Sequence, residues 1–201
     1  MGRPRAADRL PIIESTVGSI GRGPVELVVD RQHLDRVVRQ GILAAKVSLA
    51  IATADFKAML VPEIGLGRRR APSIVELLAK LARRGVEIRV LHAGVPSTAA
   101  LHELKKKLPP RLTFRRCPRL HAKVVVVDCR AMYLGSANLT GAGLGAKVDG
   151  KRNFELGVWT ESPSLIDAVL EQFDSLWEGE RCRTCRRRDI CPVPLEEPTL
   201  R

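Results

Sequence analysis

Four side chains near the middle of the chain could capture a phosphate diester and attack its phosphorus. His121 and Lys123 stand two residues apart, and Ser136 and Asn138 have the same spacing. An imidazole can act as the nucleophile, while an ammonium, a hydroxyl and a carboxamide can hold phosphate oxygens. Alternate residues of a β-strand share one face, so each pair should project to one side. If the two segments pair, all four side chains converge on one pocket.

Two hydrophobic runs must position these side chains, and the sequence predicts that both are strands. The first covers Ala122 to Val127 and the second covers Ala131 to Gly135. Val124 to Val127 is apolar at every position, which is typical of a central strand covered by helices on both faces.

The rest of the chain predicts an alternation of strands and helices. Further strands are expected at 25–29, 47–53, 86–91, 112–116 and 155–160, and helices at 34–45, between Ser73 and Gly85, at 98–108 and from Pro163 to Gly179. Ser73 and Glu76 form a capping-box signature, and Gly85 stands where a helix C-terminus would end. This order predicts an α/β sandwich with a mixed sheet. The sequence shows no internal repeat.

Length and composition indicate a single domain of ordinary size with a basic arm and a separate tail. The chain has 201 residues, of which 45% are hydrophobic. We expect a basic N-terminal arm at 1–23, the main domain at 24–180 and a cysteine-rich tail at 181–201. The sequence contains no apolar run of membrane-spanning length and no signal peptide, so the expected location is the cytoplasm, without membrane association.

The charge of the chain favours a polyanionic partner. The chain carries 34 Lys and Arg against 22 Asp and Glu, a net charge of +12. Eight basic residues gather before and within the first motif, namely Lys105, Lys106, Lys107, Arg111, Arg115, Arg116, Arg119 and Lys123. Nucleic acid is therefore the first expectation for a partner. Because only 3% of residues are aromatic, we expect contacts to the phosphate backbone more than base stacking.

The full motif resembles that of the phospholipase D superfamily, His-x-Lys-x4-Asp-x6-Gly-Ser-x-Asn. Every fixed position is matched, by His121, Lys123, Asp128, Gly135, Ser136 and Asn138. The Asn-x-Glu element expected downstream is supplied by Asn153 and Glu155. The resemblance implies a phospholipase D-like α/β/α sandwich with a mixed sheet and a nuclease-like phosphodiesterase activity.

The resemblance also implies a role for each residue. His121 would attack phosphorus and form a phosphohistidine, while Glu155 would accept a hydrogen bond from its other ring nitrogen. Lys123 and Asn138 would hold the non-bridging oxygens, and Ser136 would add a hydroxyl or orient a neighbour.

Two further features of the motif region are the place of Asp128 and the lack of a second motif copy. Asp128 lies at the far end of its strand and on the opposite face, so we interpret it as structural support. A second group must protonate the leaving alkoxide, yet the motif occurs only once, and His33, His92 and His102 lack its pattern. Single-copy members of the family solve this with a symmetric homodimer, which we expect here.

The tail carries a second motif, Cys182-x2-Cys185-x5-Cys191. In a cytoplasmic chain, such spacing favours a metal over disulfides, and structural zinc requires four ligands. The fourth ligand must be Cys117 or Cys129, of which Cys117 is preferred because it would tie the tail to the wall of the active site. An iron–sulfur cluster and unliganded thiols are alternatives. Catalysis by histidine needs no cofactor.

Three functions remain open at the level of sequence. The first is a DNA-directed nuclease that acts as a homodimer. The sequence shows no recognisable specificity domain, so either recognition is weak or a specificity partner protein supplies it. The second is a phospholipid phosphodiesterase. The third is a non-catalytic nucleic-acid-binding module of a defence or repair assembly.

Overall fold

The computed structural model describes residues 25–62, 71–94, 108–187 and 190–191. The expected N-terminal arm lies outside these ranges, and so does the helix expected at 98–108 except for its last residue.

Within the described ranges, one mixed sheet of seven strands forms the centre of the domain. Its strands are β1 (Val25–Val29), β2 (Ser48–Thr53), β3 (Glu87–His92), β4 (Leu112–Arg116), β5 (Val124–Val127), β6 (Ala131–Gly135) and β7 (Leu156–Thr160). Their order across the sheet is β1-β7-β6-β5-β2-β3-β4. Strands β2, β3 and β4 run parallel, and all other neighbours are antiparallel. The predicted mixed sheet is confirmed.

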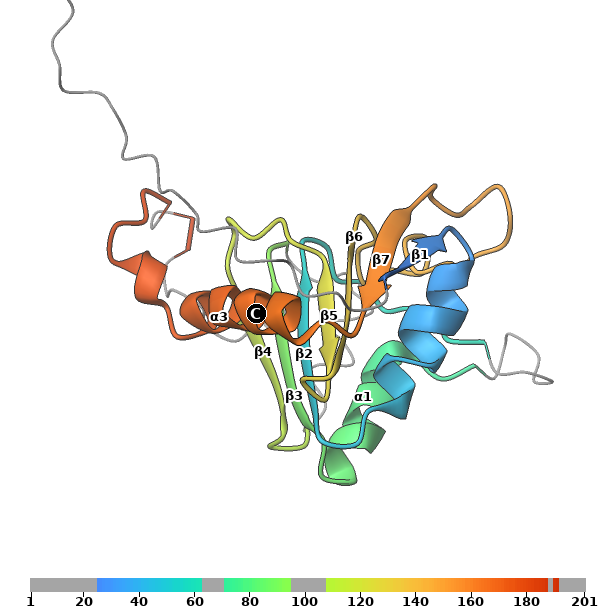
Figure 1. The fold of residues 1–201 in the computed structure, drawn as a ribbon, viewed down its shortest axis with the longest axis horizontal. Coiled ribbons are helices and arrows are strands. Elements are labelled where there is room, and N and C mark those ends of the chain that lie inside the picture. Colours follow the sequence, from blue (N-terminus) through green and yellow to red (C-terminus); the bar gives the residue numbers. More distant parts are fainter. Residues whose placement is uncertain (1–24, 63–70, 95–107, 188–189, 192–201) are drawn as a thin grey trace, which may run out of the picture.

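Helices lie on both faces of this sheet, which confirms the sandwich (Figure 1). Helix α1 (Ile74–Arg83) covers one face and α3 (Pro163–Trp177) crosses the other. The predicted capping box is present: Ser73 Oγ accepts from the backbone N–H of Glu76 at 3.1 Å, and the Glu76 carboxylate accepts from Ser73 N–H at 3.2 Å. No helix in the described part of the chain combines the length and the apolar character needed to cross a membrane.

The helix expected at 34–45 is replaced by two shorter elements. A π-helix covers Leu34–Arg39 and a 3-10 helix covers Ile42–Ala44. Gly41 separates them and packs tightly, since a Cβ atom there would lie 2.8 Å from the Trp159 ring. A regular helix built on the apolar spacing alone could not make this close approach, so the prediction of one continuous helix was wrong.

Two hydrophobic clusters bury the central strands. Val125 and Val127 of β5 belong to the cluster on the α1 face, while Val124 and Val126 belong to the cluster under α3. β5 is thus buried on both faces, as its uninterrupted apolar sequence predicts. This rigid strand holds the residues that precede it at a fixed place on the sheet edge.

Helix α3 covers only part of its face and leaves an apolar surface open. Leu134 of β6, Val158 of β7 and Leu27 of β1 lie in register across three strands. Leu27 is 62% exposed, and Leu156 at the start of β7 is 59% exposed. We call these residues, together with Val25, the open apolar face. Exposed apolar residues that lie together in this way are a candidate surface for an interaction.

Candidate active site

The strand register brings the predicted site residues to one edge of the sheet. Ala52 of β2 pairs with Val124 of β5, and Val124 pairs with Leu134 of β6. Gly135 pairs in turn with Gly157 of β7. Because β2 and β6 end where β5 and β7 begin, the motif residues that flank these strands gather at this edge. The two motif strands pair with each other, which is the condition that the sequence set for bringing the motif residues together.

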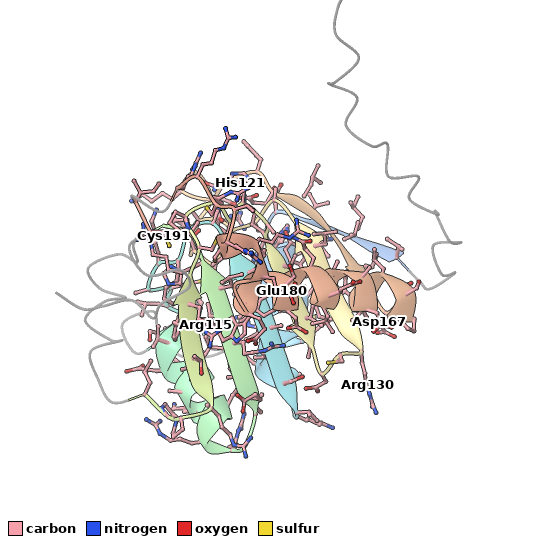
Figure 2. All side chains as sticks on the ribbon, turned by 90° about the vertical axis from the view of Figure 1, so that its left-hand side faces the viewer. Arg115, His121, Arg130, Asp167, Glu180 and Cys191 are labelled. Atoms are coloured by element: carbon pink, nitrogen blue, oxygen red, sulfur yellow. The ribbon has the colours of Figure 1, made fainter. Side chains whose placement is uncertain are left out.

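His121 and Lys123 form the first group at this edge. Both precede β5 instead of lying within it, and His121 is exposed at one end of the molecule (Figure 2). Lys123 is only 9% exposed, and its ammonium lies 3.2 Å from His121 Nδ1 and 3.3 Å from Nε2. The ammonium also donates to the His121 carbonyl at 2.8 Å. The ammonium is thus almost equidistant from both ring nitrogens and places positive charge beside the ring.

Glu155 forms the centre of the second group. Its carboxylate accepts from Ser136 Oγ and, at 3.0 Å, from the Asn153 amide. Glu155 is 7% exposed, and its own N–H donates to the Asp30 carboxylate at 2.9 Å. Both carboxylate oxygens are therefore held in place. In the described ranges of this single chain, no hydrogen bond joins Glu155 to His121, so its predicted role as the acceptor stays a prediction.

Asn138 forms the third group with the end of β2. Its side-chain oxygen accepts from Asp55 N–H at 3.0 Å and from Thr53 Oγ1 at 3.3 Å. Because a backbone N–H only donates, the oxygen must face Asp55 and the amide nitrogen is directed elsewhere. That nitrogen is a suitable donor to a phosphate oxygen.

Asp128 lies at the other end of β5, away from the other motif residues. Figure 2 shows its neighbour Arg130 at the opposite end of the molecule from His121. The Asp128 carboxylate accepts from the N–H groups of Lys46, Val47 and Ser48 at 2.8 to 3.2 Å. Burial alone would raise the pKa of Asp128, but these backbone donors lower it below its ordinary value. Its contacts agree with a supporting role.

A buried tyrosine beneath the site was missed by the sequence analysis. Tyr133 lies on β6 with its hydroxyl 2.9 Å from His33 Nε2, and the N–H of Ala137 donates to it at 3.2 Å. Burial raises the pKa of Tyr133 to about 12 and lowers the pKa of His33. Both groups are therefore neutral at pH 7. Because Ala137 stands between Ser136 and Asn138, this pair anchors the turn that carries both.

Two glycines make room for the Tyr133 ring. A Cβ atom on Gly135 would lie 2.3 Å from the Tyr133 hydroxyl, and one on Gly157 would lie 2.2 Å from the ring. Gly135 of the motif therefore has to be a glycine, because Tyr133, which anchors the turn, occupies the space that a Cβ atom would need. The presence of a single tyrosine in the chain was the only available signal.

Two of the eight basic residues that gather before and within the first motif make hydrogen bonds that hold the fold together. Arg115 donates to the carbonyl of Trp177, and Arg116 donates to the Ala93 carbonyl at 3.1 Å. Arg119 is exposed beside His121. Lys105, Lys106 and Lys107 lie outside the described residues.

Three of the predicted metal ligands line one cavity beside His121. Cys117, Cys182 and Cys185 share a cavity of about 310 Å³ with His121. Cys191 is half-buried and Cys129 is exposed. As they stand in the described ranges, no three side chains of metal-binding type lie close enough together to hold an ion.

Comparisons with known proteins concern the family and the fold of the chain. A family model described as the PLD-like domain of cardiolipin synthase matches residues 38–177. In structure, the chain is similar to NucT from Helicobacter pylori, with 17% identity over 78% of this chain and 96% of that chain and a TM-score of 0.58. It is also similar to Nuc, a phospholipase D family member from Salmonella typhimurium, with 19% identity, 78% and 95% coverage and a TM-score of 0.55.

A third structural neighbour is TrmBL2, an archaeal chromatin protein with a novel mode of DNA binding. Its identity is 18%, its TM-score is 0.51, and the match covers 84% of this chain and 56% of that one. At these identities the structural matches show a shared fold. No curated protein sequence matches the chain.

Proposed function

The chain belongs to the phospholipase D superfamily, and from this premise we propose that it is a nuclease that cleaves DNA through a phosphohistidine. The observation that carries the proposal is the contact of the nearly buried Lys123 ammonium with the exposed His121 ring. This contact places a cation that can hold the phosphate beside the imidazole that attacks it.

The geometry supports the following reaction. A ring nitrogen of His121 forms a bond to phosphorus, and the bond from phosphorus to the leaving alkoxide breaks. Lys123 and the amide nitrogen of Asn138 donate to the non-bridging oxygens, where negative charge grows. A second acid gives a proton to the alkoxide. The same group then takes a proton from water, which attacks phosphorus and releases His121. No cofactor takes part.

The second acid is the His121 of another copy of this chain. His33 and His92 are fully buried, and His102 lies outside the described residues, so within the described ranges no other histidine can serve. Phe154, which is 96% exposed, stands next to Glu155 at the border of the open apolar face. A second copy that packs against this surface would bury it, and the proposed dimer shares one site between two His121 side chains.

Nucleic acid is the proposed substrate because of the charge of the chain. The net charge of +12 favours a polyanion over a neutral or zwitterionic lipid. The exposed Arg119 borders His121, where it can contact a phosphate that neighbours the scissile one. With few aromatic side chains for base stacking, the enzyme is expected to read the backbone, and a partner protein would supply specificity.

Labelled DNA, RNA and phospholipid vesicles, each with and without EDTA, test the proposal. We expect cleavage of DNA that EDTA does not abolish, and a loss of at least about a thousandfold in His121→Ala with DNA binding retained. Cleavage of phospholipid in preference to DNA would assign the family's lipid chemistry to the chain instead. Full cleavage by His121→Ala would refute the proposed nucleophile.

Mixing the wild-type chain with the His121→Ala variant tests whether two chains share one active site. If each site needs two His121 side chains, subunit exchange with a ninefold excess of His121→Ala leaves about one wild-type chain in ten with a wild-type partner. Activity per wild-type chain then falls about tenfold. Unchanged activity would show that each chain works alone.

A second candidate function is a DNA-binding module without catalysis. The similarity to TrmBL2, described as a chromatin protein that binds DNA, favours it. This candidate predicts DNA binding without cleavage of any of the three substrates, and a His121→Ala variant that keeps its biological effect.

A further inference from the structure

The cysteines of the tail face inward while their neighbours face solvent. Cys182, Cys185 and Cys191 are half-buried, and the residues between them are exposed where they are described. Exposed arginines at 181, 183, 186 and 187 surround the first two cysteines. Cys182 and Cys185 also line one cavity, so these two thiols border the same space.

The fold brings Cys117 to the same place by fixing the end of β4 to the end of α3. The Arg115 guanidinium lies 4.6 Å from the centre of the Trp177 ring and donates to the Trp177 carbonyl. Cys117 follows Arg115 by two residues, and Cys182 follows Trp177 by five. Cys117 and Cys182 consequently pack against the same hydrophobic cluster under α3.

Local hydrogen bonds set the backbone on both sides of the cavity. The N–H of Cys117 donates to the His92 carbonyl at 2.8 Å, and its carbonyl accepts from Leu120 N–H at 2.9 Å. On the other side, Cys185 N–H donates to the Cys182 carbonyl at 3.2 Å, which closes a tight turn between these two cysteines. A Cys-x2-Cys turn is one of the ligand spacings that structural zinc sites use, and here it shares a cavity with a third cysteine.

We propose that Cys117, Cys182, Cys185 and Cys191 bind one structural zinc ion, a site that goes beyond the proposed nuclease function and does not depend on it. Since no three of these groups lie within reach of one ion as they stand, binding draws the thiols together and closes the cavity of about 310 Å³. Four thiols release four protons and leave a site with two net negative charges. Arg119 and Arg181, which line the same cavity, balance that charge.

The zinc ion would fix the wall that leads into the active site. Residues Leu120, His121 and Ala122 line the cavity together with three of the four cysteines, all but Cys191. Figure 2 shows Cys191 and His121 toward the same end of the molecule. His121 thus lies beside the metal but is left out of its coordination. A thiolate set satisfies zinc without it, and His121 stays available for catalysis.

Zinc content of the purified full-length chain tests the proposal directly. We expect about one zinc ion per chain, and its loss in Cys182→Ser and in Cys185→Ser. Cys129→Ser is the matched control, because this fifth cysteine is exposed and lies outside the cavity, and it should keep the metal. His121→Ala should also keep it.

Two further measurements need only the wild-type chain, so they test the proposal even if a cysteine variant does not fold. Replacement by cobalt should give the intense visible absorption of a tetrahedral thiolate site. A thiol reagent should react quickly with one of the five cysteines in the metal-bound chain, namely Cys129, and with all five after chelation. Purified chain that contains iron in place of zinc, or that takes up no zinc when it is supplied, would overturn the proposal. Retention of zinc in Cys117→Ser, or its loss in His121→Ala, would overturn the ligand set.

Discussion

Removal of the Tyr133 hydroxyl is the perturbation that best tests how the turn bearing Ser136 and Asn138 is anchored. In Tyr133→Phe, the ring remains, but His33 Nε2 and the Ala137 N–H each lose their partner. Both groups are buried, and an unsatisfied buried polar group costs about 1–3 kcal/mol. We therefore expect the free energy of unfolding to fall by about 2–4 kcal/mol, allowing for partial relaxation.

Urea denaturation at pH 7.5, followed by tryptophan fluorescence, measures this loss because Trp159 pairs with Tyr133 in the sheet. The matched control is Met132→Leu, the preceding residue on the opposite face of β6, which should cost less than about 1.5 kcal/mol. In the double variant His33→Phe with Tyr133→Phe, both members of the pair become apolar, and part of the loss should return.

The single variant Tyr133→Phe should also slow catalysis, since Ala137 lies between Ser136 and Asn138. We expect kcat to fall while KM changes little, because the misplaced groups act on the transition state. A stability loss below about 0.5 kcal/mol together with unchanged kcat would refute the anchoring role.

Three further predictions concern the same framework. Gly157→Ala should cost more than about 3 kcal/mol in urea denaturation, because its Cβ would lie 2.2 Å from the Tyr133 ring; near-wild-type stability would contradict the tight packing. Asp128→Ala should lower stability by about 1–2 kcal/mol at pH 7 and by less at pH 3, because a carboxyl with a lowered pKa contributes stability that is full above its ordinary pKa and is lost as the pH falls through its lowered folded-state pKa; an equal loss at both pH values would count against it. Because burial also lowers the pKa of His33 below 6.5, wild-type stability should fall as the pH drops from 7.5 to 5, and His33→Phe should reduce that slope; an unchanged slope would exclude His33.

Much of the fold and the place of the site could be predicted from patterns local in the sequence. The apolar run Val124–Val127 predicted a central strand, and the spacing of Ser73 and Glu76 predicted a helix start. The strand register then carried the two halves of the motif to one edge of the sheet. These predictions succeeded because each depends on neighbours within a few residues.

Other features could not be predicted because they depend on contacts between distant residues. His33 and Tyr133 meet across 100 positions in the sequence, so no local pattern connects them. Charge counting could not show that Arg115 and Arg116 are bound by the fold, since their partners are backbone carbonyls. The close approach of Gly41 to Trp159 likewise has no local signal.

Capture of the covalent intermediate tests the central proposal most directly. Rapid acid-free denaturation during turnover of a phosphorus-labelled oligonucleotide should leave label on the protein that acid removes and alkali does not. Peptide mass analysis should place the added phosphoryl group, with the nucleotide that it still carries as an ester, on His121, and His121→Ala should carry none. Turnover by the wild-type chain with no labelled protein at any time point, or label on another residue, would contradict the account.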